Sequence, residues 1–187
     1  DVDGLIVPGG FGERGVEGMI VACKYARTHA LPYLGICLGM QVTVIEYARD
    51  VLGFKDATSG EFAHTEHTVI DIMPDKKGKK LGGTMRLGSY PCAVKDGTKI
   101  KEAYGSNLIE ERHRHRYEFN NEYREALENG GLVISGTSPD GHIVETVEVA
   151  DHPFFVGVQF HPEFTSRPEN ANPIFAAFVK AALDNAR

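Results

Sequence analysis

The apolar residues of the chain follow two patterns: short continuous runs, and stripes in which every third or fourth residue is apolar. The runs at residues 3–7 and 31–36 predict buried strands, because strands covered on both faces are apolar throughout. Residues 13–29 and 38–52 carry the helical stripe, and Gly53 is placed to end the second helix. This alternation predicts an α/β fold with a mostly parallel sheet and helices on both faces.

Beyond residue 53 the pattern predicts more strands than helices. The strands are expected at residues 68–73, 89–94, 112–119, 132–137, 142–149 and 154–160. The helices are expected at residues 98–104, 121–129 and 172–185. A charged loop, residues 74–80, precedes a glycine-rich segment at residues 81–88. Because no repeat or linker interrupts the 187 residues, the chain is predicted to form one domain.

The most informative chemistry lies where the second predicted strand meets the second helix. Gly35-Ile36-Cys37-Leu38-Gly39 matches the Gly-x-nucleophile-x-Gly turn, with cysteine in place of serine. The glycines allow a sharp, strained turn, and the helix N-terminus beyond it favours the thiolate through its unpaired N–H groups. A buried structural cysteine in a tight turn is the alternative. The flanking glycines and the strand-then-helix pattern favour a nucleophile.

A base and an acid follow the last predicted strand, at His161-Pro162-Glu163. His161 is suited to take the thiol proton, and Glu163 to orient the imidazole and select its tautomer. Taken alone, this tripeptide is better explained as a histidine at a strand end beside a solvent-exposed glutamate. Together with the cysteine turn, it predicts a catalytic triad of Cys37, His161 and Glu163.

Composition argues against several other functions. The formal net charge of −6 opposes general binding to nucleic acid or to an anionic membrane, and no apolar run has membrane-spanning length. Three cysteines without framework spacing suit a reducing, cytoplasmic compartment, and Cys23 and Cys92 are predicted to be structural. The histidines outside the triad have no ligand-like spacing with cysteines, so no metal site is predicted.

One basic run, Arg112-His113-Arg114-His115-Arg116, allows more than one interpretation. On a strand, its three arginines would share one face and its two histidines the other. A nucleic-acid patch is disfavoured because the run is short and acidic residues flank it. A solvated basic strand is the simplest alternative.

Five segments, in order along the chain, resemble one family. Pro8-Gly9-Gly10, residues 35–41 and His161-Pro162-Glu163 are similar to motifs of the class I glutamine amidotransferases, whose fold is flavodoxin-like. Residues 81–88 and 111–118 are similar to the glutaminase domain of the CTP synthase family. The resemblance covers residues 1–187. It implies an N-terminally incomplete glutaminase domain, without the first strands and helix of its sheet and without the preceding synthase domain.

The resemblance implies a reaction and a set of site residues. L-glutamine is hydrolysed to glutamate through a thioester on Cys37, while His161 protonates the departing ammonia and then activates water. The oxyanion needs N–H donors, one from Leu38 and the other from Gly9 or Gly10. A glutamate suits the ammonium group of the substrate, and an arginine suits its carboxylate. By resemblance, the residues that hold glutamine are Gly10, Leu38, Gln41, Glu61 and Arg116.

The resemblance also implies partners. Ammonia would pass to the synthase domain of the same polypeptide, which aminates UTP to CTP with ATP and Mg²⁺; no cofactor is expected in this domain. GTP is the expected activator, with residues 81–88 as part of a lid beside the active site, and the full-length protein is expected to be a cytoplasmic homotetramer. Another triad amidotransferase, a glutamine or γ-glutamyl hydrolase, and a non-catalytic domain of the same fold are the alternatives. Residues 81–88 and 111–118 disfavour the other enzymes, and the complete triad disfavours the non-catalytic domain.

Overall fold

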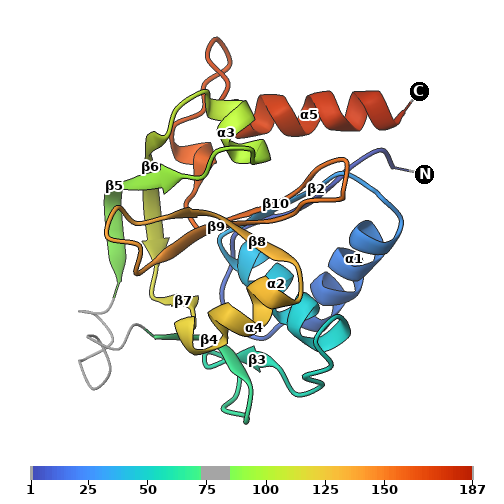
Figure 1. Cartoon of the computed structure of the whole chain (residues 1–187). Coiled ribbons are helices and arrows are strands. Elements are labelled where there is room, and N and C mark those ends of the chain that lie inside the picture. The colour runs from blue at the N-terminus through green and yellow to red at the C-terminus, as the bar shows by residue number, and fades with distance from the viewer. Residues whose placement is uncertain (1, 73–84, 187) are drawn as a thin grey trace.

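The computed structural model of the chain describes residues 2–72 and 85–186, and its centre is a seven-stranded sheet (Figure 1). The strands lie in the order β1-β2-β10-β9-β8-β5-β6. Their bounds are β1 (Leu5–Val7), β2 (Tyr33–Ile36), β5 (Arg86–Val94), β6 (Leu108–His115), β8 (Leu132–Thr137), β9 (Val144–Val149) and β10 (Phe155–Val158). In this sheet β1–β2 and β2–β10 pair in parallel, and the other four pairings are antiparallel. The predicted α/β class is confirmed, but the prediction of a mostly parallel sheet is wrong.

The connections between the strands explain why the sheet is mixed rather than parallel throughout. A parallel pair needs a crossover of a dozen or more residues, which α1 (Val16–Thr28) supplies between β1 and β2. Strands β8 and β9 are joined only by residues 138–143, a tight turn in which the Ser138 N–H donates to the Ile143 carbonyl at 2.8 Å. Apolar runs predict burial on both faces but not strand direction, so the sequence pattern could not distinguish the two halves.

Helices cover both faces of the sheet, as predicted. The helices beside α1 are α2 (Leu38–Asp50) and α4 (Arg124–Asn129), and those on the opposite face are α3 (Lys99–Tyr104) and α5 (Pro173–Asn185). Neighbouring residues of β10 accordingly belong to different apolar cores. Phe155 packs in the core that includes α1 and α2, and Val156 packs in the core that includes α3 and α5.

A second sheet has three short strands in the order β3-β4-β7. Their bounds are β3 (Thr58–Ser59), β4 (Thr68–Ile72) and β7 (Tyr117–Phe119). Strand β3 was not predicted, because two residues carry no usable periodicity. The run predicted as one strand at 112–119 is two strands, β6 and β7, in two different sheets.

The change of sheet at Arg116 corrects the predicted faces of the basic run. Along β6 exposed and buried residues alternate, so Arg112 and Arg114 are exposed while the two histidines between and after them are buried. Arg116 lies between the two strands and is only half-buried. The prediction of one shared arginine face is therefore confirmed for Arg112 and Arg114 and does not extend to Arg116, which lies outside the strand.

The other predicted strands and helices are all found, with ends displaced by a few residues. The helix predicted at 121–129 begins as a 3-10 turn, η3 (Asn121–Tyr123), and a second such turn, η4 (Pro162–Phe164), follows β10. The predicted loop at 74–80 and the first part of the glycine-rich segment, residues 81–84, lie outside the described residues. Within residues 2–72 and 85–186, none of the helices combines the length and the apolar character needed to cross a membrane.

Candidate active site

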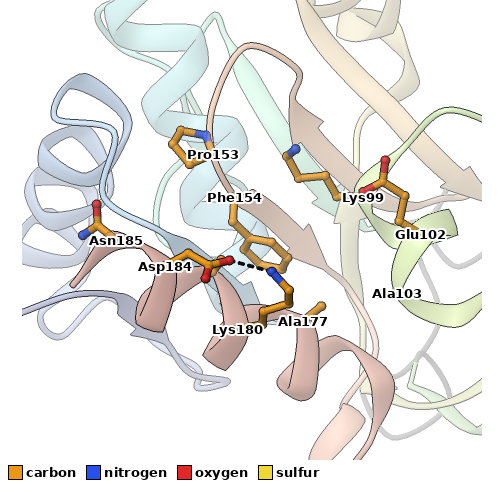
Figure 2. Close-up of a pocket in the computed structure, with 10 residues that line it drawn as sticks. Lys99, Glu102, Ala103, Pro153, Phe154, Ala177, Lys180, Asp184 and Asn185 are labelled. Atoms are coloured by element: carbon orange, nitrogen blue, oxygen red, sulfur yellow. Dashed lines mark hydrogen bonds and ion pairs between the residues drawn. The ribbon is translucent and has the colours of Figure 1, made fainter. Parts of the chain in front are cut away.

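Two of the cavities on the described part of the molecule are similar in size. One, of about 520 Å³, lies between α3 and α5, and its lining as described has neither cysteine nor histidine (Figure 2). Two of its charged groups neutralise each other, with Lys180 Nζ 2.6 Å from Asp184 Oδ2. The other cavity, of about 490 Å³, lies beyond the C-terminal ends of the parallel strands β1, β2 and β10 and contains Cys37 and His161. Ligands of open α/β sheets bind at that edge, so the second cavity is the candidate active site.

The nucleophile turn has the strain that its glycines predict. Cys37 has φ +52° and ψ −102°, an unusual conformation for a residue with a side chain. A Cβ on Gly35 would collide with the carbonyl of Gly39, and a Cβ on Gly39 would collide with the carbonyl of Val7. The Cys37 N–H donates to the Val158 carbonyl at 2.7 Å, which ties the turn to the end of β10. The turn is therefore held by its neighbours in a conformation that directs the thiol into the cavity.

His161 is held in place on three sides. Its Nδ1 lies 2.6 Å from Glu163 Oε1, its ring stacks on Phe164 at 4.8 Å between centroids, and its backbone N–H donates to the Arg112 carbonyl at 2.8 Å. Because a carboxylate only accepts, Nδ1 carries the proton and the neutral ring presents its lone pair at Nε2. Nε2 is buried, and no described residue forms a hydrogen bond with it.

Gly9 lies against both the base and the nucleophile. A Cβ added to it would be 2.8 Å from His161 Cε1 and 3.6 Å from Cys37 Cβ. The structure therefore brings Cys37 and His161 together at the loop after β1, and Glu163 contacts the far nitrogen of the imidazole. A side chain on Gly9 would disturb both groups.

The thiol of Cys37 is held in its protonated form. Burial is the largest influence and raises its pKa to about 12; Glu163 and Glu61 add to the increase, while the Leu38 N–H and the Gln159 side chain oppose it. The predicted effect of the helix N-terminus is thus present at the Leu38 N–H, which lowers the pKa of the thiol, but burial outweighs it. The thiol needs a base, and His161 is the adjacent one.

The residues that resemblance assigned to glutamine come together around this cavity. Gln41, Glu61 and Arg116 line it, as do Gly9 and Gly10, although they come from α2, from the segment after β3, from the β6–β7 junction and from the loop after β1. Glu61 Oε1 accepts the N–H of Gly12 at 2.9 Å and so connects two of these segments. Leu38, the first residue of α2, is not part of the lining but directs its N–H at the Cys37 thiol.

The amide of Gln41 has a defined orientation. Its Nε2 donates to the Tyr117 carbonyl at 3.0 Å and to Gln159 Oε1 at 3.3 Å, so both amide hydrogens are used within the protein. Only its carbonyl oxygen is left for a ligand. Gln41 is therefore built to accept a hydrogen bond from a donor such as an ammonium or a carboxamide.

The sequence motifs did not indicate a functional role for Gln159. This residue is fully buried, and its Nε2 lies 3.6 Å from Cys37 Sγ. The signal was a polar residue directly after an apolar strand, two positions before His161 and hence on the same side of an extended segment. Other cavity residues that carried no assignment are Phe11, Met85, Arg114, His115, Tyr117 and Phe164.

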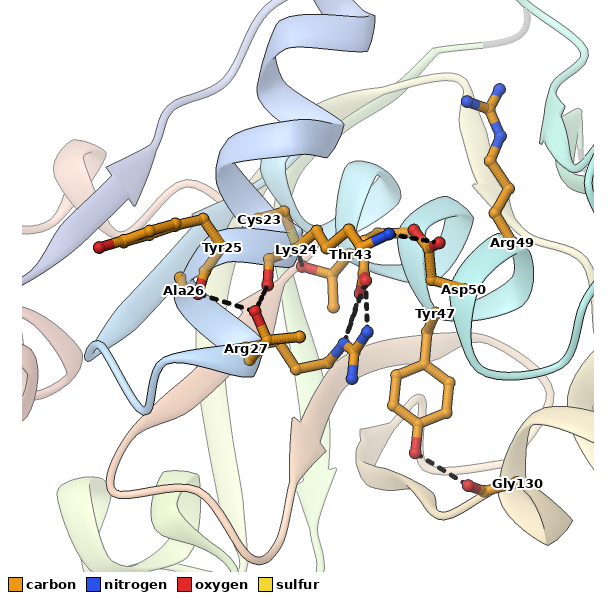
Figure 3. A network of polar contacts seen from close by, with 12 residues as sticks. Cys23, Lys24, Tyr25, Ala26, Arg27, Thr43, Tyr47, Arg49, Asp50 and Gly130 are labelled. Carbon is orange, nitrogen blue, oxygen red and sulfur yellow. Dashed lines mark hydrogen bonds and ion pairs between the residues drawn. The ribbon is translucent and has the colours of Figure 1, made fainter.

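Helix α2 is fixed from behind by polar contacts with α1 (Figure 3) and with β2. Arg27 makes a bidentate pair with the fully buried Glu46, at 2.7 and 2.8 Å. The hydroxyls of Thr43 and Tyr33 both donate to the Gly39 carbonyl at 3.0 Å, in the first turn of α2. These contacts hold the helix whose N-terminus faces the thiol.

Comparison with known proteins identifies the protein family of this chain. The family model described as "Glutamine amidotransferase class-I" matches residues 1–181. The chain therefore belongs to the class I glutamine amidotransferase family.

Comparison with individual proteins shows which members of this family the chain is similar to. Proteins named CTP synthase from Listeria monocytogenes serotype 4b and Carboxydothermus hydrogenoformans are 57% and 61% identical over 99% and 98% of this chain. The chain spans about a third of their length, 35% of each. A solved structure described as "Trypanosoma brucei CTPS - glutaminase domain with bound acivicin" has a TM-score of 0.93 and 43% identity, over 97% of this chain and 71% of that one.

A more distant structure supports the fold alone. A putative GMP synthase protein from Thermoplasma acidophilum has a TM-score of 0.63 at 20% identity, covering 98% of this chain and 74% of that chain. The class I amidotransferase-like fold is confirmed.

Proposed function

We propose that this chain is the glutaminase part of a CTP synthase and hydrolyses L-glutamine at Cys37. The observation that carries the proposal is the arrangement of Cys37, His161 and Glu163 beside a cavity that Glu61 and Arg116 also line. The names of the relatives support the particular enzyme, because 57–61% identity extends over nearly the whole chain.

The geometry suits acyl transfer in two halves. Nε2 of neutral His161 takes the thiol proton as Cys37 Sγ attacks the carboxamide carbon, and the imidazolium is stabilised by Glu163. The oxyanion accepts the Leu38 N–H and an N–H of the Gly9–Gly10 segment. Collapse breaks the C–N bond, and His161 returns the proton to the leaving ammonia. Water then attacks the thioester with His161 as base, which releases glutamate and restores the thiol.

The cavity offers matching groups to an amino-acid substrate. Glu61 pairs with the α-ammonium group and Arg116 with the α-carboxylate. The carbonyl oxygen of Gln41 accepts a further N–H from the substrate, since its nitrogen is already used. Binding an ammonium beside Glu61 also offsets a negative charge that raises the pKa of Cys37, so the substrate helps to form the thiolate that attacks it.

A covalent probe tests the glutaminase proposal. A diazo-ketone analogue of glutamine is expected to alkylate Cys37 with loss of N₂, giving a single adduct in intact-mass spectra. The Cys37→Ala variant is expected to show none. No adduct on the folded parent protein would rule out the proposed nucleophile and favour a binding domain on the same fold.

The acceptor reaction is proposed for the whole polypeptide that carries this chain. Ammonia released at Cys37 would pass to a synthase domain, which aminates UTP to CTP with ATP and Mg²⁺ in a cytoplasmic homotetramer activated by GTP. The test compares two nitrogen sources. Cys37→Ala is expected to lose CTP formation from glutamine and to keep it from ammonium chloride. Loss of CTP formation from both nitrogen sources, in a folded tetramer, would contradict the proposal that Cys37 serves only to release ammonia from glutamine.

A further inference from the structure

A chain of hydrogen bonds leads from the junction of the two sheets to the nucleophile. It starts at the Tyr117 carbonyl, which accepts from His115 Nδ1 at 3.1 Å and from Gln41 Nε2 at 3.0 Å. It continues through Gln41 Nε2 to Gln159 Oε1 at 3.3 Å, and from Gln159 Nε2 to Cys37 Sγ at 3.6 Å. Three segments that are distant in sequence, residues 115–117, residues 37–41 and Gln159, are thereby connected at one sulfur atom.

The Tyr117 carbonyl determines which groups donate and which accept along this series of hydrogen bonds. A backbone carbonyl can only accept, so the end of Gln41 that faces Tyr117 must be the amide nitrogen. The same nitrogen faces Gln159, whose near atom must then be the carbonyl oxygen. The remaining end of the Gln159 amide, which faces Cys37, is the NH₂ group. The orientation of a buried amide beside the nucleophile is thus fixed by a carbonyl in the other sheet.

We propose that Gln159 is a further catalytic residue, whose amide N–H holds Cys37 Sγ and stabilises the thiolate as His161 removes the proton. The inference deepens the proposed function and rests on it for the role of Cys37. A sulfur anion in this buried position needs donors, because burial opposes its charge and Glu61 and Glu163 repel it. Two donors face it from the described part of the chain, the Leu38 backbone N–H and the Gln159 side chain.

The surroundings of Gln159 hold its side-chain amide in one orientation. Its own N–H donates to the Glu145 carbonyl at 2.8 Å, and the side chain is fully buried, so the amide cannot turn towards solvent. Because Gln41 lines the cavity and holds the Gln159 oxygen, the same chain of contacts places the substrate-facing helix residue and the nucleophile in one rigid unit. A donor that is oriented before the reaction needs no reorganisation when charge develops on the sulfur.

The main test replaces Gln159 by methionine, which has a similar length but no N–H donor. The whole polypeptide is treated with the diazo-ketone glutamine analogue at a series of concentrations, and kinact and KI are obtained from intact-mass time courses. Gln159→Met is expected to lower kinact about tenfold, as for loss of one hydrogen bond to a charged group, and to leave KI within about twofold. A merely structural role would instead raise KI or reduce the fraction of protein that reacts. Unchanged kinact in a folded variant would overturn the inference.

A second variant and a control keep the test decisive. Gln41→Met leaves Gln159 in place but removes the contact that orients it, so kinact is expected to fall and KI to rise. An unchanged kinact would contradict the proposed series of hydrogen bonds from Tyr117 to Cys37. Ser135→Ala removes another buried hydrogen bond, Ser135 Oγ to Thr146 Oγ1 at 2.8 Å on β8, away from the cavity lining. It is expected to leave both constants unchanged, and a melting curve for each variant confirms that it is folded.

Iodoacetamide separates failure of this inference from failure of the proposed function. Its reaction at Cys37 needs a thiolate but no glutamine site. If the parent reacts with iodoacetamide and not with the diazo ketone, the glutamine reaction is excluded. The role of Gln159 is then decided by alkylation alone: about tenfold slower alkylation of Gln159→Met supports it, and an equal rate overturns it.

Discussion

Cys23 and Cys37 are both free cysteines with almost no exposed surface, 0% and 4%, yet their surroundings differ. Burial is the main influence on both thiols and raises the pKa of each to about 12. Cys23 lies within α1, 3.9 Å from the Thr43 hydroxyl in the contacts between α1 and α2 (Figure 3). Cys37 lies on a strained turn beside a cavity and a histidine.

The difference shows that neither burial nor thiol pKa separates the proposed nucleophile from a structural cysteine. What separates Cys37 from Cys23 is geometry: backbone strain that exposes the sulfur to a cavity, the lone pair of His161 nearby, and N–H donors aimed at the sulfur. A buried thiol with a raised pKa is inert without a base. With a base beside it, the thiol can lose its proton as it reacts.

The largest expected effect comes from removing one cysteine of the pair. Cys37→Ala is expected to lower glutamine hydrolysis by at least ~10⁴-fold, because no other group forms the thioester. Cys23→Ala is expected to keep the rate within about twofold and to lose only about 1 kcal/mol of stability. Ammonia release measures the rate of hydrolysis, and thermal melting measures the stability of each variant. Comparable loss of activity in both variants would contradict the distinction drawn from geometry.

The base gives the next largest effect. His161→Asn is expected to lower the hydrolysis rate roughly 10²–10⁴-fold without unfolding the protein, because the thiol then has no adjacent proton acceptor. His152 is the matched control, since it is also buried but its Nε2 faces the Ala26 carbonyl at 3.0 Å. His152→Asn should affect melting rather than turnover. Equal activity losses in the two variants would argue against His161 as the base.

Orientation of the base is expected to matter less than the base itself. Glu163→Gln removes the carboxylate 2.6 Å from His161 Nδ1, but Phe164 stacking and the His161 backbone hydrogen bond remain. A loss of roughly 10–100-fold in turnover is expected, with little change in the KM for glutamine. The exposed Glu110 supplies the control Glu110→Gln. A large increase in KM would instead place Glu163 in substrate binding.

The smallest effect concerns stability and extends the comparison to a buried histidine outside the triad. Burial first, and then Arg86, His115 and His161, lower the pKa of His113 to about 2. Between that value and about 6.5, the unfolded chain binds a proton at His113 that the folded chain does not, so stability falls as pH falls through this window, by up to about 1.4 kcal/mol per pH unit.

Urea unfolding between pH 5 and 7 measures this slope. His113→Asn is expected to reduce it, whereas His142→Asn, at an exposed position, should leave it unchanged. The nearby Glu145 has a raised pKa, mainly through burial, and acts in the opposite sense: its contribution is lost as pH rises. An unchanged slope in His113→Asn would show that the folded protein also protonates this residue in the same range.

Prediction from sequence succeeded where the cause is local. The nucleophile turn needs glycine at 35 and 39 because of contacts within a few residues and with the adjacent strand, and Cys37 has the strained conformation expected of it. The apolar periodicities located nearly every helix and strand for the same reason. The direction of β8 and β9, by contrast, depends on a turn and on partners along the sheet, and that prediction was wrong.

The sequence by itself determined the elements, the nucleophile turn and the short spacing between His161 and Glu163, because these follow from steric and hydrogen-bonding preferences over a few residues. Tertiary structure alone decided that Arg116 stands between two sheets, that burial keeps Cys37 protonated, and that Gln159 faces its sulfur. Gln159 is 118 residues from Gln41 and 122 from Cys37. A buried amide takes its orientation from such distant partners, because a buried polar group needs hydrogen-bond partners and these come from other elements of the fold.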